Sequence, residues 1–323
     1  MDLLNRICEE YGLGTLETQP VQLKGGFMHK MYSLFTSKGR YAVKLLNPYI
    51  MQRETAMENF CIAEDLEKKI EQSGIPILPA IIINDRKMQK IDERYFYLFG
   101  WYDGKALKSG EIEGSHCEKI GGILARIHGL DKRVSVCDHG EISVDWDHYI
   151  KLLESENKEL YHLLKDNRTL LYESQRIRNK AVNDLPSVVS ICHNDMDSKN
   201  VLWKGSDFRI IDLECLSYSS PVMEAYELAL CWSGYEDCDI DLDLFARFIG
   251  SYQRAGGEFG SDAETVYNSN HGRLEWLEYN VKRSLGIECS EEETAVGVSE
   301  VKDTMAHVIY YHDAKNDILN CLK

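Results

Sequence analysis

The most informative stretch of the sequence is CHNDMDSKNVL, residues 192–202, together with IIDLE at residues 210–214. It places the carboxylate of Asp195 five residues before the carboxamide of Asn200, and a second carboxylate, Asp212, after an apolar run. Transfer of a phosphoryl group needs an oriented acceptor hydroxyl and a magnesium ion, which prefers hard oxygen ligands. The spacing therefore predicts Asp195 as the base that takes the hydroxyl proton, and Asn200 and Asp212 as magnesium ligands.

The pattern H-x-D-x-x-x-x-N of residues 193–200, with D-L-E after it, resembles the catalytic loop of protein kinases. It resembles that of the aminoglycoside phosphotransferase and choline kinase family more closely. Because such a pattern alone would occur by chance at roughly a few per cent in a chain of this length, the accompanying motifs matter. The resemblance implies a protein-kinase-like α+β fold with two lobes. Residues 1–102 would form a nucleotide-binding lobe of a small five-stranded antiparallel sheet plus one helix, and residues 103–323 a larger, mainly helical lobe for catalysis and substrate binding.

Near the N-terminus, residues 21–34 predict two strands around a glycine turn at Gly25 and Gly26. The next strand, residues 40–46, carries Lys44 among apolar neighbours, and a buried ammonium group needs a partner. The resemblance implies that Gly25 and Gly26 belong to the loop that covers the nucleotide and that Lys44 holds the α- and β-phosphates. Two adjacent glycines are equally typical of a plain hairpin turn.

The expected partner of Lys44 is a carboxylate on the helix predicted for residues 53–72. In the family that the chain resembles, the pairing glutamate stands about three turns before the G-x-P that closes this helix. This favours Glu64 as the residue that holds Lys44. Glu58, on the same helix, is the alternative.

Two apolar segments, residues 77–83 and 95–101, predict the last two strands of the sheet, separated by a charged turn. Residues 99–104, FGWYDG, resemble the hinge between the lobes of a kinase. There the backbone around Trp101 and Tyr102 would meet the adenine edge. Packing of the hinge is an equally good reason for these two aromatic residues.

The remainder of the chain has helical periodicity. Helices are predicted for residues 116–130, 149–180 with a break near 166–168, 242–255, 273–285 and 301–322. His128 ends an L-A-R-I-H segment that resembles the L-A-x-L-H of the family, and we expect it to be a structural, hydrogen-bonded histidine rather than a catalytic one.

Glu214 stands in the place of the glycine of the protein-kinase D-F-G motif. The resemblance to choline kinases implies that it could help hold a second metal. Without the glycine, the flip that regulated protein kinases use is disfavoured, which fits constitutive phosphorylation of a small molecule. Asp197 replaces a lysine of protein kinases, which counts against a protein substrate, and Lys199 matches no hallmark of the family.

The composition excludes several classes of function. The 323 residues are 44% hydrophobic, which suffices for a large core, and their net charge of −16 argues against nucleic acid as a partner. No apolar run reaches the roughly 20 residues that span a bilayer, and no signal-peptide core is recognisable at the start. The 10 cysteines occur without any C-x-x-C, so neither a zinc site nor a disulfide framework is indicated. We therefore expect a cytoplasmic protein that makes no membrane contact.

The same acidity would attract a cationic substrate. Acidic side chains cluster at residues 236–243 and at Glu275 and Glu278, which flank Trp276. Carboxylates and an aromatic face together could hold an amino sugar or a quaternary amine. Most charge runs are only solvated surface, so the sequence leaves open whether these residues bind substrate or simply face the solvent.

These features predict a phosphotransferase that uses ATP or GTP with Mg²⁺ and moves the γ-phosphate to a hydroxyl of a small, cationic molecule. An aminoglycoside, choline or a related amino alcohol or sugar would fit. A catalytically silent kinase-like binding protein is an alternative that the complete set of Lys44, Asp195, Asn200 and Asp212 disfavours. A protein Ser/Thr kinase is another. The sequence leaves open a resistance or a metabolic role, and the oligomeric state.

Overall fold

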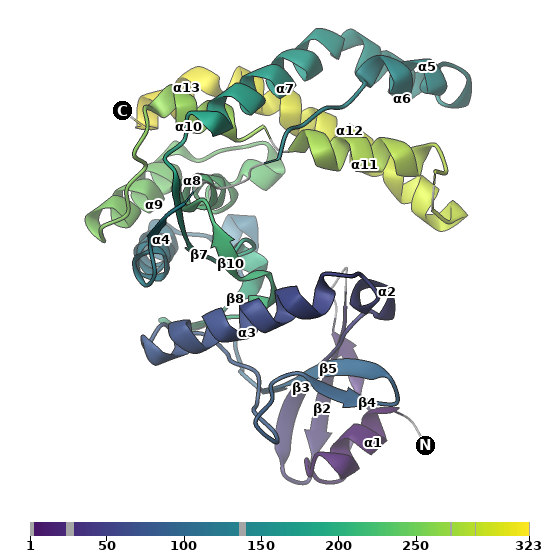
Figure 1. Ribbon diagram of the computed structural model, residues 1–323, viewed down its shortest axis with the longest axis vertical. Coiled ribbons are helices and arrows are strands. Elements are labelled where there is room, and N and C mark those ends of the chain that lie inside the picture. The colour runs from purple at the N-terminus through teal and green to yellow at the C-terminus, as the bar shows by residue number, and fades with distance from the viewer. Residues whose placement is uncertain (1–2, 24–28, 136–139, 272, 288, 323) are drawn as a thin grey trace. The chain divides into compact units, whose positions relative to one another are not determined.

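The protein divides into two compact units, residues 1–108 with 191–218 and residues 109–190 with 219–323. The structure, a computed structural model, describes residues 3–23, 29–135, 140–271, 273–287 and 289–322 (Figure 1). The predicted catalytic loop thus groups with the N-terminal residues, and the lobe boundary expected near residue 102 stays a prediction. None of the helices described is long and apolar enough to cross a bilayer.

The first unit is built on an antiparallel sheet of five strands in the order β1-β2-β3-β5-β4, as the sequence predicted (Figure 1). The strands are β1 Val21–Leu23, β2 Lys30–Thr36, β3 Gly39–Leu45, β4 Gln89–Ile91 and β5 Arg94–Gly100. The helices of this unit are α1 Leu3–Glu10, α2 Pro48–Met51 and α3 Ala56–Gln72. Its C-terminal part holds the hairpin of β8 Val201–Lys204 and β9 Asp207–Ile210, between the short 3₁₀ turns Ser198–Asn200 and Leu213–Cys215.

The two faces of the sheet bury different partners, because side chains alternate along a strand. One face packs Val43, Phe96 and Leu98 against Leu4 and Ile7 of α1. On the other face, Tyr97 packs with Phe60 of α3, and Lys44 stands opposite Tyr97 in the register of β3 and β5. The alternation therefore places Lys44 on the face that α3 covers.

The strand expected at residues 77–83 is wrong. This segment makes isolated bridges, of Ile77 with Ile210 and of Ile83 with Arg86, in place of a ladder. Its backbone hydrogen bonds include those from the Leu78 N–H to the Ile210 carbonyl and from the Ile81 N–H to the Leu98 carbonyl. The fifth strand is β4, because Asp92 and Glu93 adopt φ angles of 45° and 58° and form a tight hairpin turn that returns the chain into β5. The predicted helix 53–72 is confirmed as α3.

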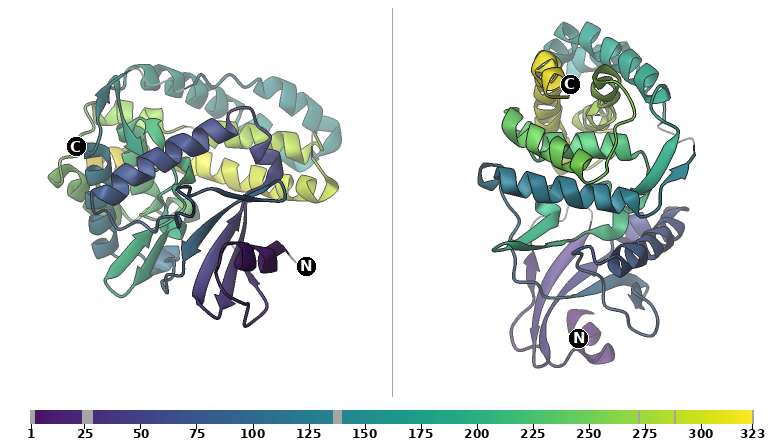
Figure 2. Two further views of the ribbon diagram at one scale, coloured as in Figure 1. Left: turned by 60° about the horizontal axis from the view of Figure 1, so that its bottom comes forward. Right: turned by 90° about the vertical axis from the view of Figure 1, so that its left-hand side faces the viewer.

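The second unit is mainly helical (Figure 2). Its helices are α4 Gly114–Gly129, α5 Trp146–Glu156, α6 Lys158–Asp166, α7 Arg168–Asn183, α8 Pro221–Cys231, α9 Leu242–Arg254, α10 Ala263–Ser269, α11 Arg273–Ser284, α12 Glu291–Asp313 and α13 Lys315–Leu322. Strand β6 Arg133–Val134 pairs with the start of β7 Val188–Cys192, and the chain passes between the units in β7 and again in β10 Ser217–Ser219. Two short 3₁₀ turns, Ser109–Glu111 and Tyr235–Asp237, complete the unit.

The helix predictions hold with two differences. The long stretch 149–180 breaks at Asn167 as expected but also at Asn157, whose side chain accepts the N–H of Leu160 and so caps α6. The last helix begins ten residues earlier than predicted, at Glu291, and is interrupted at Ala314. Leu277 and Val281 of α11 are fully buried, in a core shared with α5, α6, α7 and α12.

The contact of α4 with α9 depends on one glycine. A Cβ at Gly121 would overlap the Phe248 carbonyl oxygen, whereas one at the adjacent Gly122 would meet only the Ser251 Oγ, at 3.4 Å. Both changes to alanine favour the helix by up to about 1 kcal/mol. We expect Gly121→Ala to lower the free energy of unfolding by about 1–3 kcal/mol through overpacking, and the matched control Gly122→Ala to leave it unchanged or higher. Urea unfolding of both variants measures this, and equal stabilities would contradict it.

Candidate active site

Asp195 and Asn200 meet in the loop between β7 and β8. The Asn200 side chain is only 5% exposed, and its Nδ2 donates to the Asp195 backbone oxygen at 2.7 Å and to the Asp195 Oδ2 at 2.8 Å. The amide nitrogen is therefore committed to the predicted base. The amide oxygen of Asn200 is the atom left to face a metal ion.

A buried histidine holds this loop. The His193 Nδ1 accepts the Asp195 N–H at 3.3 Å, so the ring is neutral and its proton sits on Nε2. That Nε2–H donates to the Ile211 carbonyl at 3.1 Å, and the Ile211 N–H donates to the Asn200 carbonyl at 2.9 Å. These bonds tie the loop that carries Asp195 and Asn200 to the residue before Asp212.

Asp212 adopts a left-handed backbone, with φ 62° and ψ 55°. A residue other than glycine is strained there by about 1–3 kcal/mol, and such strain concentrates at functional sites. The turn ends the extended run of β9 and directs the Asp212 carboxylate to Lys44. The local backbone thus brings the second predicted metal ligand to the predicted phosphate-binding lysine.

Lys44 pairs with two carboxylates. Its Nζ lies 2.5 Å from the Asp212 Oδ1, and it also contacts Glu214. Burial alone would lower the pKa of Lys44, but the two negative charges outweigh it and hold the pKa above its usual value. Lys44 is therefore a permanent ammonium group in the cavity.

The predicted pairing of Lys44 with Glu64 is not what the structure shows. The Glu64 Oε1 accepts the Tyr97 hydroxyl at 3.0 Å and the Met88 N–H at 3.1 Å, while Glu58 is exposed. The carboxylate of Glu64 thus accepts hydrogen bonds from neutral donors. Lys44 instead forms ion pairs with the carboxylates of Asp212 and Glu214. Glu64 still lines the same cavity as Lys44.

His29 is a residue of this cluster that sequence reasoning missed. Its ring is 6% exposed, its Nδ1 accepts the Asn47 N–H at 2.9 Å, and its Nε2 lies 3.0 Å from the Glu214 Oε1. Because Nδ1 is an acceptor, the contact with Glu214 is a hydrogen bond from neutral imidazole. Burial would raise the pKa of Glu214, but the bonds from His29 and Lys44 outweigh it and lower the pKa. The only sequence signal was a histidine three residues after Gly26.

These side chains line one cavity of about 640 Å³ within the first unit. Asp195, Asn200, Asp212, Glu214 and Lys44 all border it, with Lys199. Its volume falls in the range of small-molecule and cofactor sites.

The predicted hinge residues border the same cavity. The Arg40 guanidinium lies 3.6 Å from the centroid of the Trp101 ring, which fixes that ring by a cation–π contact. At Gly104 a Cβ would come within 2.6 Å of the Tyr102 ring, so this position requires glycine. Gly25 and Gly26 lie outside the described residues.

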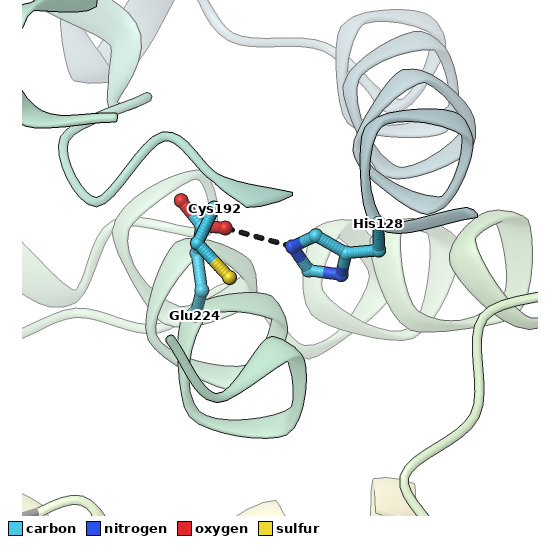
Figure 3. Close-up of side chains that lie close together, drawn as sticks. All are labelled: His128, Cys192 and Glu224. Atoms are coloured by element: carbon cyan, nitrogen blue, oxygen red, sulfur yellow. Dashed lines mark hydrogen bonds and ion pairs between the residues drawn. The ribbon is translucent and has the colours of Figure 1, made fainter. Parts of the chain in front are cut away.

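His128 is a buried, hydrogen-bonded histidine, as predicted (Figure 3). Its Nε2 lies 2.7 Å from the Glu224 Oε2 and its Nδ1 lies 2.9 Å from the Tyr252 hydroxyl. These bonds connect α4 with α8 and α9 inside the second unit. His128 therefore has a structural place in the helical core.

Residues 21–266 match the family model described as "phosphotransferase enzyme family". The chain belongs to this family. It is a small-molecule phosphotransferase with an alcohol group as acceptor. No curated protein matches its sequence.

Solved structures share the fold of this phosphotransferase at low sequence identity. A spectinomycin phosphotransferase in complex with ADP and spectinomycin aligns with TM-score 0.71 and 14% identity over 96% of this chain and 97% of its own. An amicoumacin kinase in complex with AMP-PNP and Ca²⁺ aligns with TM-score 0.58 and 12% identity over 94% and 93%. A microcompartment-associated aminopropanol kinase aligns with TM-score 0.59 and 15% identity over 97% and 98%. These neighbours confirm the predicted protein-kinase-like α+β fold.

The second unit of the phosphotransferase has a cavity of about 410 Å³. Four carboxylates, one guanidinium and one indole contribute to its lining: Glu236, Asp237, Glu300, Asp303, Arg273 and Trp276. Of the predicted substrate residues, Glu236 and Asp237 of the 236–243 cluster and Trp276 border it, whereas Glu275 and Glu278 do not. Glu278 instead accepts the Tyr149 hydroxyl at 2.6 Å and pairs with Lys282 at 2.9 Å, and Glu275 is exposed.

The Glu214 cluster predicts a pH dependence of stability. Because the pKa of Glu214 is lower in the folded phosphotransferase than in the unfolded chain, its contribution is present above the unfolded pKa and is lost as the pH falls through the folded one. Glutamine does not titrate. We expect the difference in free energy of unfolding between wild type and Glu214→Gln to be constant above about pH 5 and to shrink below it.

Urea unfolding between pH 3 and pH 7 measures this difference. Glu58→Gln, at an exposed position on α3, is the control and should match wild type at every pH. A Glu214→Gln difference that persists undiminished to pH 3 would contradict the lowered pKa.

Proposed function

We propose that this phosphotransferase uses ATP or GTP with Mg²⁺ to phosphorylate a hydroxyl of a small cationic molecule. The observation that carries the proposal is the convergence of a base, two metal-ligand candidates and a phosphate-binding lysine on one cavity. Asp195 and Asn200 share one loop, Asp212 follows β9 and Lys44 comes from β3 more than 150 residues earlier, yet all four border the 640 Å³ cavity. A binding protein without activity would not need this full set.

The donor atoms fit magnesium. Asn200 offers its amide oxygen, and Asp212 and Glu214 offer carboxylate oxygens, which are the hard ligands that Mg²⁺ prefers. When bound there, the ion would neutralise charge on the phosphate oxygens. The complexes of two neighbours with ADP and with AMP-PNP and Ca²⁺ support a nucleotide and a divalent ion.

The roles of the chain's own residues follow from their placement. Asp195 accepts the proton of the acceptor hydroxyl while that oxygen attacks the γ-phosphorus. Asn200 holds Asp195 through two hydrogen bonds, so the carboxylate keeps its direction. Lys44 holds the α- and β-phosphates, and the backbone around Trp101 and Tyr102 meets the base of the nucleotide.

The cavity of the second unit is our candidate for the site that holds the cationic part of the acceptor. Its carboxylates outnumber its guanidinium group, and Trp276 is 46% exposed, so a cation could contact both charge and an aromatic face. Burial lowers the pKa of His307 in its lining, so this imidazole adds no positive charge at neutral pH. Spectinomycin and aminopropanol, named for two neighbours, are amines of suitable class.

Charge and cysteine chemistry support the remaining expectations. A net charge of −16 disfavours nucleic acid as a partner. The nine cysteines within the described ranges form no disulfide with one another, which fits the reducing conditions of the cytoplasm.

The base assignment makes a direct prediction. Asp195→Ala should lower turnover by about 100-fold or more, because the acceptor proton loses its base, and should leave nucleotide affinity nearly unchanged. Asp207→Ala, an exposed acid in the same unit, is the matched control. Mg²⁺-dependent ATP and GTP consumption is measured with spectinomycin, other aminoglycosides, choline, ethanolamine and aminopropanol. Wild-type turnover in Asp195→Ala would refute the assignment of the base.

The acceptor cavity makes a second prediction. Glu300→Gln should raise KM for the active amine by about three- to tenfold, the cost of one partly exposed charge, with little change in kcat. Glu275→Gln is the control, since it removes an exposed carboxylate that does not line the cavity. Equal KM values for the two variants would contradict the assignment of the acceptor site to this cavity.

A further inference from the structure

Lys199 is placed at the predicted base by two carboxylates. It lies on the 3₁₀ turn Ser198–Asn200, and its Nζ is 3.1 Å from the Asp195 Oδ1 and 2.7 Å from the Asp197 Oδ2. Its N–H also donates to the Asp197 Oδ1 at 3.0 Å. Asp197 therefore fixes both the backbone and the side chain of Lys199, and the ammonium group borders the 640 Å³ cavity.

This arrangement is more than a surface ion pair. The Lys199 side chain is 56% exposed, and a single pair at such exposure would be worth at most about 1 kcal/mol. Here two carboxylates share one ammonium group. Lysine is ordinarily protonated at neutral pH, so Lys199 brings a positive charge to Asp195 and Asp197.

The geometry of transfer puts a phosphoryl group within reach of that charge. The base must lie within about 3 Å of the acceptor oxygen, and that oxygen about 3–3.5 Å from the phosphorus it attacks. The oxygens of the transferring group then come within about 6 Å of Asp195, on the cavity side. An ammonium group held 3.1 Å from the Asp195 Oδ1 is near enough to contact them.

We propose that Lys199 is a catalytic residue that contacts the oxygens of the transferring γ-phosphoryl group, and that Asp197 is the positioning residue that holds it there. The inference rests on the proposed function. In the step, the bond between the γ-phosphorus and its bridging oxygen breaks, and the bond from the acceptor oxygen to phosphorus forms. The hydroxyl proton passes to Asp195. Lys199 keeps its protons and stabilises the charge on the phosphoryl oxygens.

If Lys199 contacts the γ-phosphate, its removal should weaken the binding of nucleotides that carry this group and leave the binding of ADP unchanged. Lys199→Ala should lower turnover at least tenfold or so and lower the affinity for AMP-PNP roughly threefold or more, with the affinity for ADP unchanged, because ADP lacks the contacted group. Lys199→Arg keeps the charge and should recover part of both losses. Asp197→Asn should act in the same direction as Lys199→Ala, with a smaller effect.

Calorimetric titration with ADP and with AMP-PNP in the presence of Mg²⁺, alongside turnover, tests this on the full chain. Lys204→Ala removes an exposed lysine of β8 in the same unit and should match wild type. Wild-type turnover in Lys199→Ala, or equal changes in the affinities for the two nucleotides, would overturn the role of Lys199. A wild-type protein that binds neither nucleotide would overturn the proposed function, and this inference with it.

Discussion

The ion pairs of Lys44 with Asp212 and Glu214 are the interactions on which the active site depends. An ammonium group on the buried face of β3 costs several kcal/mol unless carboxylates compensate it. The compensation comes from Asp212 and Glu214 in the segment after β9, so these ion pairs fix the distance between this segment and strand β3. This in turn requires the left-handed turn at Asp212, whose strain the two ion pairs offset.

Neutral histidines orient the polar residues around this cluster. His29 and His193 each accept a backbone N–H at Nδ1, which leaves the proton on Nε2 for a second bond. For His29 that second bond goes to Glu214, and for His193 it goes to the Ile211 carbonyl. A neutral ring that bridges two loops adds rigidity without adding charge. The net charge of the residues that line the cavity therefore comes from its lysines and carboxylates.

The sequence predicted which side chains gather around the cavity better than it predicted the partner of Lys44. The spacing of Asp195, Asn200 and Asp212 is local, and short loops and one hairpin bring such residues together whatever the rest of the fold does. The partner of Lys44 was not local. Glu64 and Glu214 are both acidic, and which one meets Lys44 depends on two donors that already bind Glu64, the Met88 backbone N–H just before β4 and the Tyr97 hydroxyl of β5. Similarly, the apolar run 77–83 has the composition of a strand, but the turn residues Asp92 and Glu93 decide which segment pairs with β5.

The charge of the cavity explains why nucleotide and metal should bind together. Five carboxylates, of Glu64, Glu67, Asp195, Asp212 and Glu214, line it, against the two ammonium groups of Lys44 and Lys199. A triphosphate adds further negative charge to a site that is already acidic, and in a partly buried cavity this repulsion is weakly screened. A divalent cation held by the carboxylates of Asp212 and Glu214 would offset this repulsion, and Lys44 would then be available to the phosphates. The ion pairs of Lys44 with Asp212 and Glu214 are thus an arrangement that a metal–nucleotide complex could replace, because it would bring a cation for the carboxylates and phosphates for the ammonium group.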